Sequence, residues 1–152
     1  MNDRTLCFPL TAQRILLGYK KSGFGAGKVN GFGGKVEQGE NPREAAAREL
    51  WEECGIHAAL ADLNHHGMLA FRFPSRPAWD QDVHVFSVRT WQGEPAESEE
   101  MIPAWYDQRA VPYERMWADD IHWLPRLLAG EQFSATFTFA ADCEQIAAIE
   151  WG

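Results

Sequence analysis

Three glutamates stand close together in one short stretch of the sequence, at Glu49, Glu52 and Glu53. On a helix, residues spaced i, i+3 and i+4 lie on one face, so this spacing gathers three carboxylates. Like charges this close repel, and folding alone gives no reason to place them together. Hard divalent cations give such a reason, because they take oxygen ligands and bind alongside substrate phosphates. The spacing indicates a metal site for phosphate chemistry; for an isolated E-x-x-E-E pattern, a solvated acidic helix face is the alternative.

The segment that carries these glutamates has clear signals of a helix from Pro42 to Glu53. Asn41 is a favourable N-cap, and Pro42 suits the first helical position. Glu44 stands three residues after the cap, as in a capping box. Gly55 is placed to end the helix. The sequence therefore predicts one helix with clear N-terminal and C-terminal caps and with the three carboxylates on its surface.

Two further residues extend the pattern. Arg48 can pair with a neighbouring carboxylate and hold it in orientation, and Glu40 lies just ahead of the helix and could reach the same cluster. With them, the segment resembles the Nudix box, in which Gly, five residues, Glu and seven residues precede Arg-Glu-U-x-Glu-Glu-x-Gly-U, where U is apolar. The matching positions are Gly34, Glu40, Arg48, Glu49, Leu50, Glu52, Glu53, Gly55 and Ile56.

The resemblance implies the Nudix fold, an α/β/α sandwich around a mixed β-sheet, and substrates in which a nucleoside diphosphate is linked to another group. In that chemistry a divalent cation neutralises the phosphates and lowers the pKa of a bound water. Mg²⁺ is the expected cation, with Mn²⁺ as a substitute. The implied ligands include the backbone carbonyl of Gly33 together with Glu49, Glu52 and Glu53. Of these carboxylates we favour Glu53 as the catalytic base, with Glu49 next, and Arg48 as their orienting partner.

Around this helix the sequence predicts one α+β or α/β domain over residues 1–152. The stretch Ser22–Gly34 has six glycines among thirteen residues, so it wraps a ligand or makes tight turns. Runs of strands between two helices predict a mixed sheet flanked by helices. The predicted strands are Thr5–Leu10, Arg14–Tyr19, Gly67–Phe73, Asp82–Trp91, Ile102–Tyr106 and Phe133–Phe139, and the second helix is Asp119–Leu128, bent or shortened by Pro125.

Charge and cysteine content narrow the possible partners and the compartment. The net charge of -8 gives no general attraction for DNA or RNA, although a cation between carboxylates and phosphates would still permit binding of a small polyanion. Three cysteines without C-x-x-C spacing argue against a disulfide framework or a zinc site and for a reducing compartment. No stretch approaches the length of a membrane span. We therefore expect a cytoplasmic monomer that binds a small nucleotide.

A narrower resemblance extends over most of the chain. The motifs KKSGFGAG (20–27), NGFGGKVEQGE (30–40), DVHVF (82–86) and MWADD (116–120) resemble the MutT-homologue branch of the Nudix family. Members of that branch hydrolyse oxidised purine nucleoside triphosphates, among them 8-oxo-dGTP and 2-hydroxy-dATP, to the monophosphate and pyrophosphate. Because these motifs lie outside the Nudix box, the resemblance also implies a class of substrate.

Matching the branch position by position implies a set of substrate contacts. Asn30, Asp119 and Asp120 match base-reading residues, and Trp117 matches the ring that stacks on the purine. Glu100 matches a contact to metal or water from a loop opposite the helix. The remaining implied contacts are Thr5 and Lys20 near base and sugar, Phe24 and Phe71 in the pocket wall, and Phe32, Gly33, Gly34 and Lys35.

Several alternatives stay open. Asp119 and Asp120 stand where a helix begins, so they could be ordinary capping residues. The pair His65-His66 is more typical of a surface loop than of a metal site. The chain has Val29 where the branch has Trp, and Gln81 where it has an apolar residue, so the substrate spectrum is open. A dinucleoside polyphosphate, ADP-ribose or a nucleotide sugar is the competing substrate class, and a non-catalytic nucleotide-sensing module is the competing function.

Overall fold

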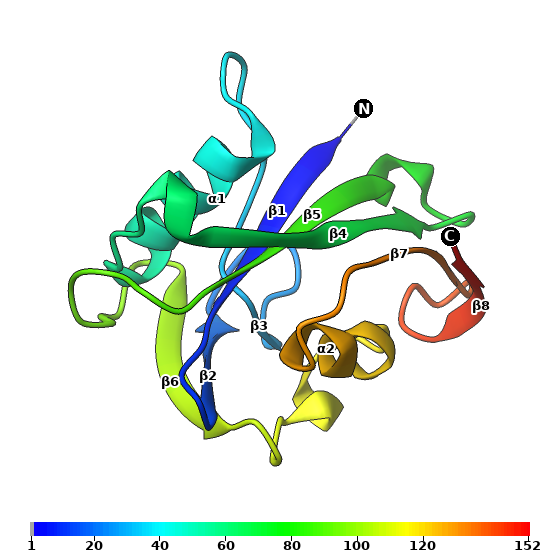
Figure 1. Ribbon diagram of the computed structural model, residues 1–152. Helices are drawn as coiled ribbons and strands as arrows, with labels where there is room; N and C mark the ends of the chain where they lie inside the picture. Colours follow the sequence, from blue (N-terminus) through cyan, green and yellow to red (C-terminus); the bar gives the residue numbers. More distant parts are fainter. Residues whose placement is uncertain (1) are drawn as a thin grey trace.

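Two β-sheets form the framework of the computed structural model, which describes residues 2–152 (Figure 1). A five-stranded mixed sheet has the order β1-β5-β4-β7-β8, in which the β1–β5 and β4–β7 pairs are parallel and the β5–β4 and β7–β8 pairs are antiparallel. A three-stranded antiparallel sheet has the order β3-β2-β6. The strands are β1 (Asp3–Pro9), β2 (Arg14–Lys20), β3 (Val29–Asn30), β4 (Leu63–Arg72), β5 (Gln81–Val88), β6 (Met101–Asp107), β7 (Phe133–Phe139) and β8 (Ile146–Trp151).

Helix α1 (Pro42–Cys54) begins at the predicted residue and ends one residue after the predicted Glu53, with Gly55 as its C-cap. The side-chain oxygen of Asn41 accepts a 2.8 Å hydrogen bond from the backbone N–H of Glu44. The Glu44 carboxylate in turn accepts from the backbone N–H of Asn41 at 2.9 Å, which completes the capping box. Gly55 adopts a left-handed conformation with φ 76°, which a side chain would disfavour, and it ends the helix. These caps fix where the glutamates of α1 stand.

Helix α2 (Asp120–Leu128) lies at the other end of the five-stranded sheet from α1, near β7 (Figure 1). It continues through Pro125, the sixth of its nine residues, to the predicted end at Leu128, so the prediction that Pro125 could shorten the helix is wrong. Three short 3₁₀ turns complete the structure, η1 (Leu60–Asp62), η2 (Pro77–Trp79) and η3 (Tyr113–Arg115). Among residues 2–152, no helix has both the length and the apolar character to cross a bilayer.

The five-stranded sheet separates two hydrophobic clusters. Alternate side chains of β5 point to opposite faces, so Val83 and Val85 join one cluster and Phe86 and Val88 join the other. The first cluster contains Trp123 of α2 and the second lies beneath α1. The predicted mixed sheet between helices is therefore confirmed. The second cluster also holds two buried cysteines, Cys7 and Cys54, and all three cysteines are free thiols.

Several features differ from the sequence predictions. Strand β4 begins at Leu63 and not at Gly67, so His65 and His66 lie in a strand and not in a loop, and β5 ends at Val88 and not at Trp91. Strand β8 was not predicted, because its side chains are mostly exposed and show no apolar alternation. The two residues of β3 are hidden in the glycine-rich stretch. The expectation that both members of the histidine pair are surface residues is wrong for His66, which is buried with Nε2 2.7 Å from Ser87 Oγ and Nδ1 2.8 Å from the Glu131 carbonyl.

Candidate active site

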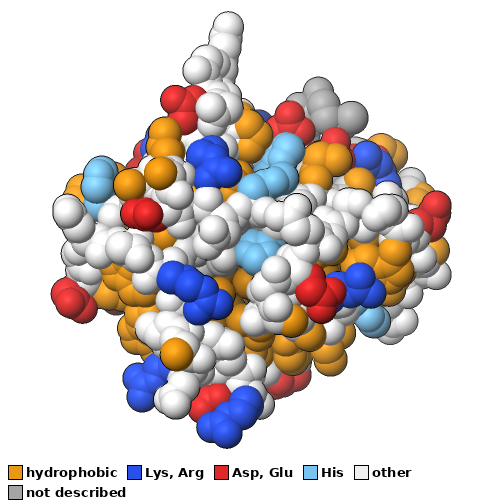
Figure 2. Space-filling model, viewed as in Figure 1, with side chains coloured by type: hydrophobic (Ala, Val, Ile, Leu, Met, Phe, Trp, Pro, Cys, Tyr) orange, Lys and Arg blue, Asp and Glu red, His pale blue; other side chains and the backbone are white. Residues whose placement is uncertain are grey.

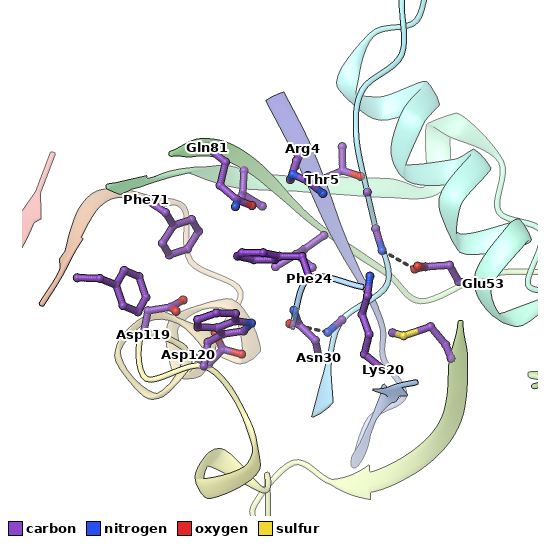
Figure 3. Close-up of a pocket in the computed structure, with 18 of the residues that line it drawn as sticks. Arg4, Thr5, Lys20, Phe24, Asn30, Glu53, Phe71, Gln81, Asp119 and Asp120 are labelled. Carbon is purple, nitrogen blue, oxygen red and sulfur yellow. Dashed lines mark hydrogen bonds between the residues drawn. The ribbon is translucent and has the colours of Figure 1, made fainter. Parts of the chain in front are cut away.

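The glutamates of α1 face the loop that follows β3. Glu53 is only 4% exposed, and its Oε1 accepts a 2.8 Å hydrogen bond from the backbone N–H of Gly33 (Figure 3). Glu49 is partly buried, whereas Glu52, one turn further along, is exposed. The i, i+3, i+4 spacing therefore does place the carboxylates on one side of the helix, at graded depth. Glu100 lies in the loop before β6, close enough to raise the pKa of both Glu49 and Glu53.

Two adjacent glycines let the loop approach these carboxylates. A Cβ on Gly34 would overlap the Oε2 atom of Glu49, and a Cβ on Gly33 would overlap the backbone carbonyl of Thr5. A side chain at Gly33 would therefore displace backbone, and one at Gly34 would displace the Glu49 carboxylate. None of the described residues donates a hydrogen bond to the Gly33 carbonyl, which leaves this oxygen available as a ligand.

Arg48 ties the helix to the preceding loop. Its guanidinium donates to Glu40 at 2.7 and 3.1 Å, to Glu52 at 3.0 Å and to the backbone carbonyl of Lys35 at 3.0 Å. Glu49 lies 3.5 Å from the same group. Glu40 thus joins the carboxylates through Arg48, and its hydrogen bonds to Arg48 lower its pKa. As predicted from the residue types, Arg48 pairs with neighbouring carboxylates.

Glu49 and Glu53 are buried with too little positive charge nearby to balance their ionised forms, so their pKa values are raised. Burial raises the pKa of Glu49 to about 7, against the nearby Arg48 and with a further increase from Glu52. Burial also raises the pKa of Glu53 to about 8, against the Gly33 N–H and with a further increase from Glu49. Within residues 2–152 the carboxylates are held by protein donors and are not gathered into a complete cation cage. Even so, the acidic oxygens, the Gly33 carbonyl and the deficit of positive charge fit a divalent cation that retains several waters.

A pocket opens beside this cluster, between the two sheets and the start of α2. Glu53, Gly33 and Gly34 line one end, so the carboxylates and the pocket are parts of one site. Other residues expected to contact substrate line it too. They are Thr5, Lys20, Phe24, Asn30, Phe71, Trp117, Asp119 and Asp120 (Figure 3).

Aromatic rings form much of the pocket wall. Phe24 and Trp117 stack with centroids 5.2 Å apart, and Phe73 and Phe139 stack at 4.6 Å. Phe73 and Phe139 were not predicted as site residues. The alternation along Phe133–Phe139 could have indicated Phe139, since it places this ring on the buried face of β7. Flat apolar walls of this kind suit a planar ligand such as a nucleobase.

Asp119 and Asp120 are buried at the wall of the pocket, 3% and 2% exposed. Asp119 makes no side-chain capping bond to α2; its Oδ2 accepts a 2.7 Å hydrogen bond from the indole N–H of Trp123. The capping alternative is therefore wrong for Asp119. Burial raises the pKa of both groups, and the Asp119 charge raises that of Asp120 further. Asp119 Oδ2 accepts from Trp123, whereas Asp120 Oδ2 is buried without a partner among the described residues, so the surroundings favour the protonated form of Asp120 over that of Asp119.

Asn30 presents its amide group to the same pocket. Its Oδ1 accepts a 2.9 Å hydrogen bond from the backbone N–H of Gly31, which leaves the amide N–H groups to donate (Figure 3). The amide donors of Asn30 thus lie around the same cavity as the carboxyls of Asp119 and Asp120.

Two of the expected substrate contacts lie elsewhere. The Phe32 side chain is fully buried in the cluster beneath α1, because β1 pairs with the backbone of residue 32 and turns the ring away from the pocket. Lys35 is exposed, and the structure uses its backbone carbonyl to hold Arg48. Neither side chain lines the pocket.

Comparison with known proteins agrees with this geometry. The model of the NUDIX domain matches residues 2–127. The chain belongs to the Nudix family. The expected Nudix fold is confirmed by a MutT protein structure from Bacillus halodurans, which superimposes with a TM-score of 0.86 at 22% identity and covers 99% of this chain and 97% of that one.

Two curated Nudix relatives are similar over most of their length. A protein of Danio rerio named oxidized purine nucleoside triphosphate hydrolase is 47% identical over 135 residues, which are 89% of this chain and 85% of the relative. The Mus musculus protein of the same name is 45% identical over the same shares of both chains. The resemblance to the MutT-homologue branch is confirmed by these relatives, and their names agree with the expectation of a Nudix hydrolase.

Proposed function

We propose that this Nudix protein hydrolyses oxidised purine nucleoside triphosphates, such as 8-oxo-dGTP and 2-hydroxy-dATP, to the monophosphate and pyrophosphate. The observation that carries the proposal is the continuity of the pocket. Asp119, Asp120 and Trp117 line the same cavity as Glu53 and Gly33. A purine between the aromatic walls would therefore direct its phosphates toward the carboxylates of α1. The names of the relatives in Danio rerio and Mus musculus support this substrate class.

Phosphate chemistry at the other end of the site depends on a divalent cation, which Nudix hydrolases generally use. Mg²⁺ is our proposed cation, with Mn²⁺ as a substitute, held by Glu49, Glu52, Glu53, the Gly33 carbonyl and, from the opposite loop, Glu100. When bound, it neutralises phosphate charge and acidifies a coordinated water. Lys20, which also lines the pocket, supplies a further positive charge for the phosphates.

The protein residues position the water and take up its proton. Glu53 is held at the mouth of the pocket by the Gly33 N–H, which orients one carboxylate oxygen and leaves the other to accept a proton from water. The resulting hydroxide attacks phosphorus, the P–O bond of the anhydride breaks, and pyrophosphate leaves. Arg48 keeps Glu49 and Glu52 oriented throughout. We place this activity in the cytoplasm and in a monomer.

A substrate panel with the purified protein tests the proposal. It compares 8-oxo-dGTP, 2-hydroxy-dATP, dGTP, dATP, ADP-ribose and diadenosine tetraphosphate, with Mg²⁺ and after exhaustive chelation. We expect oxidised purine triphosphates to have the highest kcat/KM, pyrophosphate as the product, and no turnover without cation. A preference for ADP-ribose or diadenosine tetraphosphate would assign the fold to the competing substrate class, and stepwise release of orthophosphate would contradict the site of attack.

A further inference from the structure

Two polar residues interrupt an apolar floor in the pocket. The floor is one face of the five-stranded sheet, with Leu6, Phe71 and Val83 among its side chains. Arg4 of β1 pairs in register with Val83, and Gln81, two residues earlier on β5, pairs with Phe71. Because side chains alternate along a strand, Arg4 and Gln81 point to the same face as these apolar neighbours. Figure 3 shows both on the sheet side of the pocket, across from Asp119 and Asp120.

Gln81 is buried with part of its hydrogen-bonding capacity unused. It is 7% exposed, and its Nε2 donates to the backbone carbonyl of Trp79 at 3.1 Å. No donor from residues 2–152 reaches its Oε1 atom, and Nε2 retains a second hydrogen. A carboxamide buried among apolar side chains loses free energy unless both groups are paired, so a partner from the pocket itself would stabilise it.

Arg4 is half-buried and close enough to Glu49 for that charge to act on it, yet it too has a group without a partner in the described part of the chain. Its Nε atom is buried and has no hydrogen-bond partner among the described residues, although the residue lines the pocket. A guanidinium carries only donors, so the partner it needs is an acceptor such as a carbonyl oxygen. The floor therefore offers a carboxamide that can donate and accept, beside a group that can only donate.

This combination matches a group that distinguishes one oxidised base. An 8-oxo-purine carries N7–H next to C8=O, whereas an unmodified purine has a bare N7 acceptor next to C8–H. A carboxamide can accept from N7–H and donate to the C8 oxygen, and a guanidinium can donate to that oxygen as well. We propose that Gln81 and Arg4 read the oxidised N7–C8 edge of the base directly, while Asp119 and Asp120 read the opposite edge. This inference rests on the proposed function and specifies how the same pocket selects among purines.

A purely structural role for Gln81 predicts something different. Its bond to the Trp79 carbonyl holds η2, and Trp79 packs edge-on against Phe24 at 5.0 Å and Phe73 at 5.6 Å. If Gln81 served only to make this hydrogen bond, removing its amide would loosen the packing of Trp79 against Phe24 and Phe73. Turnover of all substrates would then fall together, along with the melting temperature.

The test compares kcat/KM for 8-oxo-dGTP, dGTP and 2-hydroxy-dATP in wild type, Gln81→Met, Arg4→Met and Arg4→Lys. Gln13→Met, an exposed residue in the β1–β2 turn, is the control. We expect Gln81→Met and Arg4→Met each to lower the 8-oxo-dGTP to dGTP ratio by roughly tenfold, the effect of one lost hydrogen bond, and Arg4→Lys, which keeps a donor, to lower it less. Turnover of dGTP and 2-hydroxy-dATP should change by less than about threefold. Equal losses for all three nucleotides would overturn the inference and leave Gln81 as a support for Trp79.

A substrate variant tests the same contact without altering the protein. The 7-methyl derivative of 8-oxo-dGTP keeps the C8 oxygen but lacks N7–H. Wild type should lose about as much activity on it as Gln81→Met loses on 8-oxo-dGTP, and Gln81→Met should show little further loss. Wild type that makes no distinction between the two nucleotides would rule out the Gln81 contact. Failure of wild type to turn over any oxidised purine triphosphate would instead defeat the proposed function.

Discussion

The carboxylate of Asp119 accepts its hydrogen bond from the indole N–H of Trp123, one turn further along α2, at 2.7 Å. Trp123 is fully buried in the core, so this bond anchors Asp119 from behind and leaves its neighbour Asp120 to differ in protonation. The two adjacent carboxyls are thus unequal: Asp119 Oδ2 is fixed as an acceptor, whereas burial and the charge of Asp119 favour the protonated form of Asp120. Four predictions follow from this inequality and from the geometry around α1.

Asp119→Asn and Asp120→Asn should change the turnover of 8-oxo-dGTP and 2-hydroxy-dATP unequally. A protonated carboxyl can donate to O6 of a guanine-type base, and an ionised one accepts from a ring N–H or an exocyclic amine. Each amide fixes one pattern, and each unmatched pairing should cost about 1–3 kcal/mol. Measurement of kcat/KM for both nucleotides on both variants checks this. Equal losses that follow the melting temperature would reduce the pair to structural residues.

Asp120→Asn should raise the stability of the ligand-free protein in a pH-dependent way. Burial raises the folded pKa of Asp120 well above its ordinary value of 3.8, so the folded state binds the extra proton. The contribution of this proton to the free energy of unfolding is therefore complete below pH 3.8, and it is lost as the pH rises toward the raised pKa of Asp120. The variant should melt about 2–4 °C above wild type at pH 8 for each kcal/mol recovered, and this advantage should vanish near pH 4. Asp62→Asn, at an exposed position, is the control, and a pH-independent difference would contradict the prediction.

Glu53→Gln should lower kcat by roughly 10²-fold or more, because it removes the proton acceptor and one charge while preserving shape. Glu44→Gln makes the same chemical change on the same helix, but glutamine can still complete the capping box. Its kcat should stay close to that of wild type. Steady-state kinetics at saturating Mg²⁺ checks both variants. A Glu53→Gln enzyme within a few-fold of wild type would place the base elsewhere, with Glu49 as the next candidate.

Gly34→Ala should lower activity with little effect on stability, whereas Gly33→Ala should lower stability. The added methyl of Gly34→Ala meets the end of a flexible side chain, Glu49, which can move aside at little cost in stability. We expect a melting temperature close to wild type and a loss of activity of at least about tenfold that higher Mg²⁺ partly restores. In Gly33→Ala the methyl meets the backbone carbonyl of Thr5, so stability itself should fall. Calorimetry and Mg²⁺ titration of activity separate the two, and equal melting temperatures would contradict the distinction.

The local chemistry of the site could be predicted from the sequence where it is encoded by spacing along the chain. The capping box of α1 and the shared face of Glu49, Glu52 and Glu53 are of this kind, since both depend on residues three or four apart along one helix. Asp119, Asp120 and Trp117 were expected at the site from resemblance alone, and they line the pocket. Among residues that reach the site from strands, the resemblance named Thr5 and Phe71 and noted Gln81 as a departure from the branch, but Arg4 and Phe139 were missed. Arg4, Gln81 and Phe139 come from β1, β5 and β7, and only the pairing of those strands brings them together.

Side-chain direction was harder to predict than position in the chain. Phe32 belongs to the same loop as Gly33 and Gly34, yet its ring packs beneath α1 because neighbouring residues of an extended segment face opposite ways. The polar side chain of His66 was expected at the surface. It is buried because Ser87 and the Glu131 carbonyl pair with its two ring nitrogens. Strand β8 gave no apolar alternation, because it is exposed along most of its length.

The two thiols buried beneath α1 affect how well the protein itself resists oxidation. Burial raises the pKa of both Cys7 and Cys54, and the Cys54 thiol donates to the Leu50 carbonyl at 3.4 Å. Peroxides attack the thiolate, so two protonated, fully buried sulfur atoms resist conversion to sulfenic acid. A protein that hydrolyses oxidised nucleotides is needed most when oxidants are abundant. Because its two core cysteines resist oxidation, its fold would stay intact under the conditions that produce its substrate.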